Sequence, residues 1–291
     1  MPITTFSLGE ITLHGLIEDE GPYSDIRKLF PALTPAQLDA ARPTLGEALD
    51  AADQAVFRYQ AYLVRLPGMN VLVDSCIGND KERPGRPSWH RRHDHRFLGG
   101  LAELGLSVQD IDVVMCTHLH ADHVGWNTRL ENGRWVPTFP HARYLFSARE
   151  LAHWEAENAR TPVAALVDSV LPVVAAGRAE LIGSDLELTE SLRLLPTPGH
   201  TPDHFSVRIG RGRDLAVLTG DALHSPLQLA HPELSPWFDW DPARAAHTRR
   251  ALLERYCETE TLFCTTHFPG CSCGHIRRAE AGFRCDPPKG P

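Results

Sequence analysis

The sequence predicts an α+β protein in which packed sheets are flanked by helices. Short apolar runs bounded by turn residues recur along the chain, as is typical of buried strands. Helix signals are fewer than strand signals, and no regular alternation of strand and helix appears. A chain of 291 residues is also long enough to bury a large core within one domain.

The individual elements follow from local patterns. Two helices are predicted from their first turns: Ser147 and Glu150 match a capping box, and Asp241 precedes Pro242 at the start of a helix that ends near Tyr256. Apolar, β-branched runs predict strands at residues 11–17, 56–65, 71–74, 142–146 and 204–209.

The domain prediction is a single domain over residues 1–291, with an N-terminal excursion at about 18–55 and a loop insert at about 78–97. Both segments look irregular, and the second is rich in Pro, Arg and His. Each is a candidate lid or dimer contact, and a solvated loop is the more ordinary interpretation. If the chain forms a homodimer, apolar Leu29, Phe30 and Leu33 in the first segment are the candidate contact residues.

Composition excludes several classes of partner. With 29 Lys and Arg against 37 Asp and Glu, the net charge of −8 argues against nucleic acid as a partner. The N-terminal residues lack a basic start followed by an apolar stretch, and no run approaches eighteen apolar residues. We therefore expect a cytoplasmic protein that does not bind membranes.

The cysteines do not indicate a disulfide scaffold, because they number seven and several lie in apolar runs. Cys271 and Cys273 lie near His267 and His275 and are a conceivable metal site. Their spacing is shorter than that of known structural zinc pairs, so two free thiols are the preferred interpretation.

Residues 117–126 read THLHADHVGW and place His118, His120, Asp122 and His123 within six positions. Sixteen of the 291 residues are His, yet such a pattern arises by chance in only about a few of a thousand chains of this length. The stretch therefore predicts a metal site.

Three further residues share the context of this motif, in which a buried strand ends in a sharp turn. His200 follows the run 192–195, Asp221 follows 215–218, and His267 follows 262–264, as His118 follows 113–116. Strand ends in one region of a sheet can converge on one place.

The donor types predict two ions. Imidazole nitrogen and carboxylate oxygen suit Zn²⁺ and similar divalent ions, with zinc as the default. Too many ligands are present for one tetrahedral ion, whereas two ions sharing Asp221 would each have four protein ligands. The predicted ligands are His118, His120, Asp122, His123, His200, Asp221 and His267.

This order of motifs resembles the metallo-β-lactamase superfamily of hydrolases, from about Tyr62 to His275. The resemblance implies an αββα sandwich, with two mixed sheets flanked by helices and the metals at one edge. It also implies a carboxylate, here Asp74, near the first histidines. The implied ligand sets are His118, His120 and His200 for one ion, Asp122, His123 and His267 for the other, with Asp221 bridging.

Within the superfamily, the chain looks most like the branch of N-acyl homoserine lactone lactonases and methyl parathion hydrolase. The turn at Gly220 and Asp221 and the ending His267-Phe-Pro-Gly270 carry this similarity. Many of the lactonases have Tyr three residues after the bridging Asp, where this chain has His224. Diiron redox proteins of this fold have Glu where this chain has His120.

The predicted activity is hydrolysis of a small ester or lactone, such as an acyl homoserine lactone, with a metal-bridging hydroxide as the nucleophile. Asp122 and His224 are the catalytic candidates. His224 either binds the oxyanion, protonates the leaving group or only packs. The alternatives are an organophosphate or aryl ester hydrolase, a glyoxalase II-like thioesterase and a metal-binding scaffold protein without activity.

Two further expectations concern residues near the predicted ligands. His204, four residues after His200, either supports the metal ligands or only faces the core, and the core is the preferred interpretation. Several aromatic residues near the metal turns either fill cores or form an apolar wall for a substrate, namely Trp126, Trp135, Trp237, Phe238 and Trp240.

Overall fold

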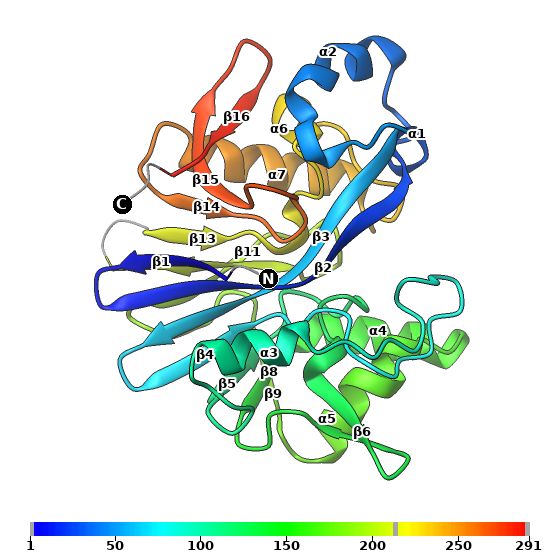
Figure 1. Cartoon of the computed structure of the whole chain (residues 1–291), viewed down its shortest axis with the longest axis vertical. Helices are drawn as coiled ribbons and strands as arrows, with labels where there is room; N and C mark the ends of the chain where they lie inside the picture. The colour runs from blue at the N-terminus through cyan, green and yellow to red at the C-terminus, as the bar shows by residue number, and fades with distance from the viewer. Residues whose placement is uncertain (1–2, 212–214, 289–291) are drawn as a thin grey trace. The chain divides into compact units, whose positions relative to one another are not determined.

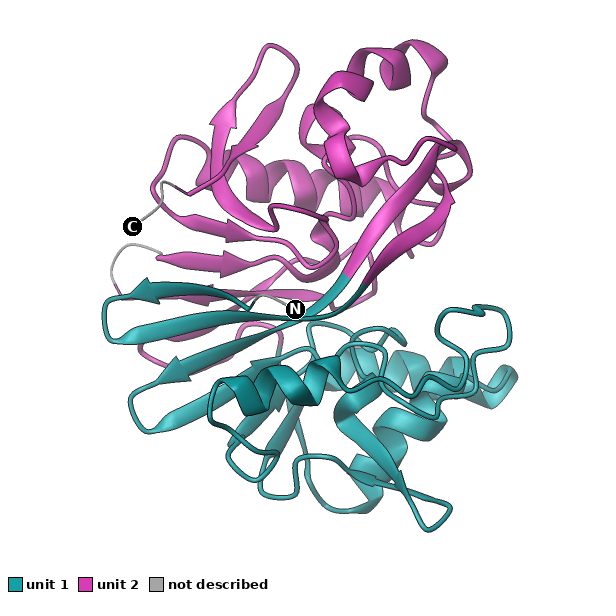
Figure 2. Ribbon diagram, viewed as in Figure 1, with its two compact units in different colours: residues 1–19, 59–183 teal, residues 20–58, 184–291 magenta. Residues whose placement is uncertain are grey.

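The computed structural model describes residues 3–211 and 215–288. The chain divides into two compact units (Figure 2). Unit 1 comprises Met1–Asp19 and Tyr59–Gly183, and unit 2 comprises Glu20–Arg58 and Ser184–Pro291. Each unit is described separately below.

The first large sheet is mixed, which agrees with the α+β prediction. Strands β4, β5, β8 and β9 are parallel neighbours, so the turns that follow β4 and β5 lie at the same edge of the sheet. In the described part of the chain the order of its seven strands is β1 (Thr4–Leu8), β2 (Ile11–Asp25), β3 (Gln54–Leu66), β4 (Met69–Val73), β5 (Val113–Met115), β8 (Arg143–Ser147) and β9 (Ala179–Ile182) (Figure 1).

The second sheet lies within unit 2 and is also mixed. Strands β13 and β14 are parallel, whereas β12 is antiparallel to both β11 and β13. The turns after β11, β13 and β14 therefore lie at one edge. Within the described residues, its seven strands are ordered β10 (Glu187–Thr189), β11 (Leu192–Pro196), β12 (Phe205–Ile209), β13 (Ala216–Leu218), β14 (Leu262–Cys264), β15 (Cys273–Arg278) and β16 (Phe283–Asp286).

Both predicted helix starts are confirmed. Ser147 caps α4 by accepting the Glu150 N–H, and Asp241 caps α7, with Pro242 in its first turn and Tyr256 at its end. The helices are α1 (Ile26–Leu29), α2 (Pro35–Leu45), α3 (Arg96–Glu103), α4 (Ala148–Arg160), α5 (Leu171–Ala175), α6 (Leu227–Ala230) and α7 (Pro242–Tyr256). Shorter elements are the turns η1 (Gly46–Ala48), η2 (Gly125–Asn127), η3 (Leu166–Val170) and η4 (Gly220–Ala222), and the hairpin β6 (Thr128–Glu131) and β7 (Arg134–Pro137).

The reading of residues 18–55 as irregular is wrong. Strand β2 continues to Asp25, and helices α1 and α2 follow. Thr34 and Gln37 form a reciprocal capping box at the start of α2, a signal present in the sequence. The apolar side chains of Leu29, Phe30 and Leu33 are buried, so they do not support the expected homodimer contact.

The segment 78–97 carries no helix or strand until α3 begins at Arg96. Buried ion pairs hold part of it, because Arg83 binds both carboxylate oxygens of Asp168 at 2.7 and 2.9 Å. Burial lowers the pKa of the neighbouring Lys81 to about 7. This insert is therefore anchored within unit 1.

Within residues 3–211 and 215–288, no helix is both long and apolar enough to cross a membrane. Each unit has its own apolar core, formed in unit 1 around Leu72, Val114 and Phe146 and in unit 2 around Val217, Leu253 and Phe263.

Candidate metal centre

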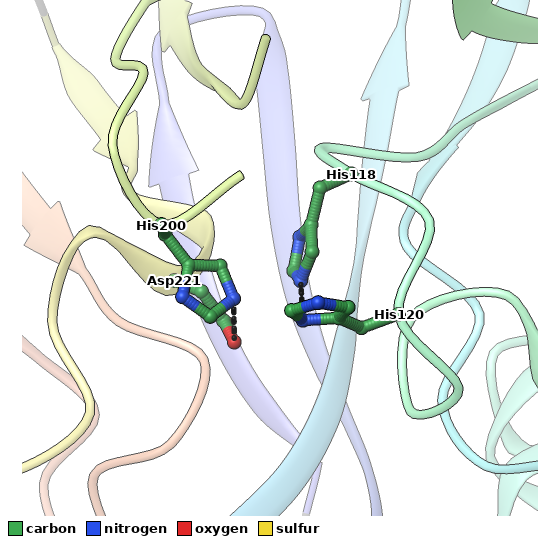
Figure 3. Close-up of side chains that lie close together, drawn as sticks. All are labelled: His118, His120, His200 and Asp221. Atoms are coloured by element: carbon green, nitrogen blue, oxygen red, sulfur yellow. Dashed lines mark hydrogen bonds and ion pairs between the residues drawn. The ribbon is translucent and has the colours of Figure 1, made fainter. Parts of the chain in front are cut away.

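The predicted ligands of unit 1 lie in the turn after β5. His118 and His123 are fully buried, and His118 Nε2 faces His120 Nδ1 at 2.9 Å (Figure 3). Two nitrogens bound to one tetrahedral zinc lie about 3.3 Å apart, because each bond is about 2.0–2.1 Å long. The side chain of Asp122 is 13% exposed, and its Oδ2 lies 4.0 Å from His123 Nε2.

Asp74 orients this motif from the end of β4. Its carboxylate accepts the Thr117 N–H at 2.7 Å and pairs with His123 Nδ1 at 2.9 Å. Because Nδ1 is engaged, Nε2 is the nitrogen of His123 that can serve as a ligand atom. The expected position of Asp74 near the first histidines is thus observed.

The residues after the motif are tightly packed. A Cβ on Gly125 would lie 1.9 Å from the Ile77 carbonyl oxygen, so only glycine fits there. Trp126 stacks on Phe97 at 5.6 Å and donates its indole N–H to Glu18 at 2.7 Å. Trp126 belongs to the core of unit 1 and is not a surface aromatic residue.

The predicted ligands of unit 2 are grouped around Asp221, which lies in the turn after β13. His267 Nε2 lies 3.1 Å from Oδ1, and His200 Nε2 lies 3.4 Å from Oδ2, the pair drawn in Figure 3. All three side chains are buried. Because His267 Nε2 is also 3.2 Å from Oδ2, one carboxylate lies between the two imidazoles with Oδ2 near both of them.

The other ring nitrogens of these histidines also have protein acceptors. His200 Nδ1 pairs with Asp239 Oδ1 at 2.9 Å, and His267 Nδ1 donates to the Arg58 carbonyl oxygen at 2.8 Å. Because both contacts occupy Nδ1, Nε2 is the nitrogen of each ring that can bind a metal, and it is also the nitrogen near Asp221. Phe57 stacks on the His267 ring at 4.9 Å and limits its rotation.

His204 combines the two roles considered for it. It is buried as expected, but its Nε2 accepts the Asp221 backbone N–H at 2.9 Å, and its Nδ1 lies 2.9 Å from Thr197 Oγ1. His204 thus holds the backbone of the Asp221 turn in addition to filling the core.

His224, three residues after Asp221, lies beside the same carboxylate. Its Nε2 is 3.1 Å from Asp221 Oδ2, and its ring is parallel to that of His267 at 5.5 Å. Among the described residues, Nδ1 is buried without a hydrogen-bond partner. The ligand-type atoms of Asp221, His224 and His267 all lie within 4.8 Å of one another.

Of the aromatic residues expected near the metal turns, Phe238 makes ring contacts with His200 and His224. Its ring packs edge-on against His200 at 5.7 Å and His224 at 5.1 Å. Tyr23 packs against Phe238 and Phe57. The other expected residues differ, since Trp237 and Trp240 are exposed and Trp135 carries Lys81 over its ring.

Sequence reasoning missed Asp239 and Arg249, both fully buried in their side chains and 3.4 Å apart. Burial lowers the pKa of Arg249 to about 10, so it remains cationic at neutral pH. Burial raises the pKa of Asp239, and nearby His224 and Arg249 oppose that shift. A sequence signal exists, because Arg249 lies on the apolar face of α7 with Ala245 and Leu252.

The cysteines are free thiols, as expected. Cys264 and Cys273 are partners in the β14–β15 register, and the Cys271 thiol donates to the Cys273 carbonyl oxygen. Among residues 3–211 and 215–288, no cluster of ligand-type atoms includes a cysteine.

The donor set fits divalent metal ions. It consists of imidazole nitrogens and carboxylate oxygens, which suit zinc and similar ions. His123, His200 and His267 each engage Nδ1 with a protein acceptor and leave Nε2 for a metal, which is the usual arrangement of metal-binding histidines.

The fold and the two groups of potential metal ligands are those of a metal-dependent class of protein. A comparison with known protein families identifies the same class. The family model of the metallo-β-lactamase superfamily matches residues 56–267. The chain therefore belongs to the metallo-β-lactamase superfamily and has its α+β fold.

Two curated relatives match part of the chain. An N-acyl homoserine lactonase of Bacillus cereus is 29% identical over 133 residues, 45% of this chain and 46% of that protein. The uncharacterised protein YobT of Bacillus subtilis (strain 168) is 27% identical over 174 residues, 58% of this chain and 63% of that protein. The matched region spans about half to two thirds of each relative.

Solved structures match the whole fold. The hydrolase AbOPH of the β-lactamase superfamily has a TM-score of 0.82 at 22% identity, covering 99% of this chain and 98% of its own. AidC, described as a dizinc quorum-quenching lactonase, has a TM-score of 0.81 at 20% identity, covering 99% and 97%. At this identity, the similarity establishes the fold.

Proposed function

We propose that this chain is a dinuclear metal-dependent hydrolase of small esters or lactones. Of the seven predicted ligands, His118, His120 and His200 would hold one ion, Asp122, His123 and His267 would hold the other, and Asp221 would be shared between them.

The observation that carries this proposal is the position of the Asp221 carboxylate. Its Oδ2 lies 3.4 Å from His200 Nε2 and 3.2 Å from His267 Nε2, and its Oδ1 lies 3.1 Å from His267 Nε2. Asp239 and the Arg58 carbonyl oxygen bond the Nδ1 atoms of these two rings and so fix their orientation. A carboxylate placed between two oriented imidazoles can bridge two ions, as two-ion hydrolytic sites require.

Bound divalent ions lower the pKa of water and polarise a carbonyl or phosphoryl oxygen, which is the chemistry that ester hydrolysis needs at neutral pH. The protein fixes the position of Asp221 through two histidines. His204 accepts a hydrogen bond from its backbone N–H, and His224 pairs with its carboxylate. Asp122, whose side chain is partly exposed, is the second catalytic candidate. His224 Nδ1 is the atom that would meet the substrate oxygen.

The substrate class follows from the apolar rings beside the histidines. Phe238 and Tyr23 are half-buried and provide an aromatic surface that fits an acyl chain or an aryl group. The partial similarity to an N-acyl homoserine lactonase favours a lactone with an acyl chain. Aryl esters and organophosphates are the second candidate, because aromatic side chains also stack on aryl leaving groups.

A substrate panel with metal analysis of the same preparation tests this function. The panel comprises acyl lactones, aryl esters, a phosphotriester and a glutathione thioester. We expect two ions per chain and hydrolysis of a lactone or ester. Hydrolysis of the thioester alone would favour a glyoxalase II-like activity, and two bound ions with no hydrolysis at all would leave a metal-binding scaffold.

The His224→Ala substitution is expected to reduce kcat about 10- to 100-fold, because an imidazole beside the reacting oxygen is lost. Metal analysis should still give two ions per chain, since the ligand set is intact. His231→Ala is a matched control, because His231 contacts Gln37 and Glu233 and no predicted ligand. If kcat of His224→Ala equals that of the wild type, His224 only packs.

A further inference from the structure

Arg249, in the middle of α7, is fully buried and bonded to several backbone segments. Its Nε donates to the Ala222 carbonyl oxygen at 2.8 Å, and Nη1 donates to the carbonyl oxygens of Pro232 and Leu234 at 2.8 and 2.9 Å. Ala222 directly follows Asp221. One buried cation therefore holds the Asp221 turn and the loop 231–241 together.

The loop 231–241 carries Asp239, the only side chain to which this guanidinium is paired among the described contacts. Arg249 Nη2 lies 3.4 Å from Asp239 Oδ2, and the other oxygen, Oδ1, pairs with His200 Nδ1 at 2.9 Å. Asp239 thus connects the buried cation to the His200 ring.

The backbone of the same loop is bonded to the His200 turn. Trp240 N–H donates to the His200 carbonyl oxygen at 3.0 Å, and Asp241 N–H donates to the Gly199 carbonyl oxygen at 2.9 Å. A Cβ on Gly199 would lie 2.3 Å from the Ala245 nitrogen, so the start of α7 lies directly against this turn. The helix that carries Arg249 is therefore packed against Gly199, in the turn that leads to His200.

A buried ion pair is a poor way to gain stability, because the cost of removing both charges from water often exceeds their attraction. An apolar side chain at position 249 would fill the same face of α7, which also presents Ala245 and Leu252. The contacts of the pair point to a different role, since they connect two residues that the proposed centre requires.

We propose that Asp239 and Arg249 are a positioning pair, which fixes the tautomer of His200 and the location of the Asp221 turn. Asp239 acts directly on His200, and Arg249 acts through Asp239 and the Ala222 carbonyl. This inference rests on the proposed function for the identity of the metal ligands, whereas the effect on the His200 tautomer does not depend on metal.

The first test is Asp239→Asn, which preserves the shape of the side chain. Loss of the carboxylate behind a metal-binding histidine lowers metal affinity about 10- to 100-fold. We expect a loss of this size for one of the two ions in competitive chelator titrations, together with a changed absorption spectrum of the cobalt-substituted protein. Thermal unfolding of the metal-free variant separates this effect from a loss of stability.

Asp168→Asn is the matched control. Asp168 is also buried and also paired with a buried arginine, Arg83, at 2.7 Å, but this pair contacts none of the predicted ligands. We expect this variant to lose thermal stability while keeping wild-type metal affinity and an unchanged cobalt spectrum.

The second test is Arg249→Lys beside Arg249→Met. Lysine keeps the charge and is expected to retain part of the metal affinity that methionine loses. Arg249 and Asp239 act as one unit. The fold-loss of metal affinity in the Asp239→Asn/Arg249→Met double variant should therefore be smaller than the product of the fold-losses in the two single variants.

The inference is overturned if Asp239→Asn keeps wild-type metal affinity and cobalt spectrum, or if its effect is limited to thermal stability as in the control. If the wild type binds no metal, the proposed function is wrong, but the positioning role of Asp239 and Arg249 can still be tested in the metal-free protein. There, ¹⁵N NMR should show His200 protonated at Nδ1 in the wild type and a mixture of tautomers in Asp239→Asn. The same tautomer in both proteins would overturn the inference in that case.

Discussion

Asp221→Asn is expected to reduce hydrolysis at least about 100-fold, the largest effect of any single substitution proposed here. Asparagine is nearly identical in shape but neutral, and it offers one carbonyl oxygen in place of two carboxylate oxygens. Both carboxylate oxygens lie among the histidines, because Oδ1 is 3.1 Å from His267 Nε2 and Oδ2 is 3.4 Å from His200 Nε2, so asparagine removes the negative charge and one of two potential ligand oxygens. Steady-state kinetics and metal analysis of the purified variant measure the effect.

Asp241→Asn provides the control for Asp221→Asn. Asp241 caps α7, and asparagine is an equally good N-cap, so this variant should retain wild-type activity, metal content and stability. If Asp221→Asn kept both the metal content and the rate of the wild type, the proposed bridging role of Asp221 would be wrong.

Removal of divalent ions with a chelator is expected to abolish hydrolysis, and adding Zn²⁺ back should restore it. The imidazoles and carboxylates around Asp221 are buried, so a bound ion would also stabilise the folded chain. An ion present at about 1,000 times its dissociation constant stabilises a protein by about 4 kcal/mol. Thermal unfolding with and without chelator should therefore show a large shift in Tm.

The His224→Ala variant separates two effects of the chelator. It should show the same chelator-dependent shift in Tm as the wild type, because its metal ligands are complete. A chelator that lowers neither the activity nor the Tm of the wild type would contradict a metal centre.

Much of the fold, and the placement of the predicted ligands in turns after strands, could be predicted because the signals are local. Each predicted ligand follows a short apolar run, and the runs before His118, Asp221 and His267 form β5, β13 and β14. Parallel pairing within each sheet then brings the turns of that sheet to one edge. The helix from Pro242 to Tyr256 was equally local, because its cap and its first turn are adjacent in sequence.

The missed features depend on contacts between distant parts of the chain. The carbonyl that orients His267 belongs to Arg58, 209 residues away, and Asp239 is 39 residues from His200. No local pattern relates such residues. Trp126 was ambiguous for the same reason, since only its packing on Phe97 and its bond to Glu18 place it in the core.

The prediction that residues 18–55 lack helices and strands is wrong for a different reason. The capping box at Thr34 and Gln37 was available in the sequence, as was the apolar spacing of Leu38, Ala41 and Leu45 on one face of α2. Pro43 inside this helix obscured the pattern, because proline normally interrupts a helix.

The most direct test of the central claim is a titration of the metal-free protein with Zn²⁺, in which lactone hydrolysis and bound metal are followed together. We predict that activity rises until two ions are bound per chain and that Asp221→Asn fails to reach this plateau. Full activity with one ion per chain, or in the metal-free protein, would contradict a two-ion centre bridged by Asp221.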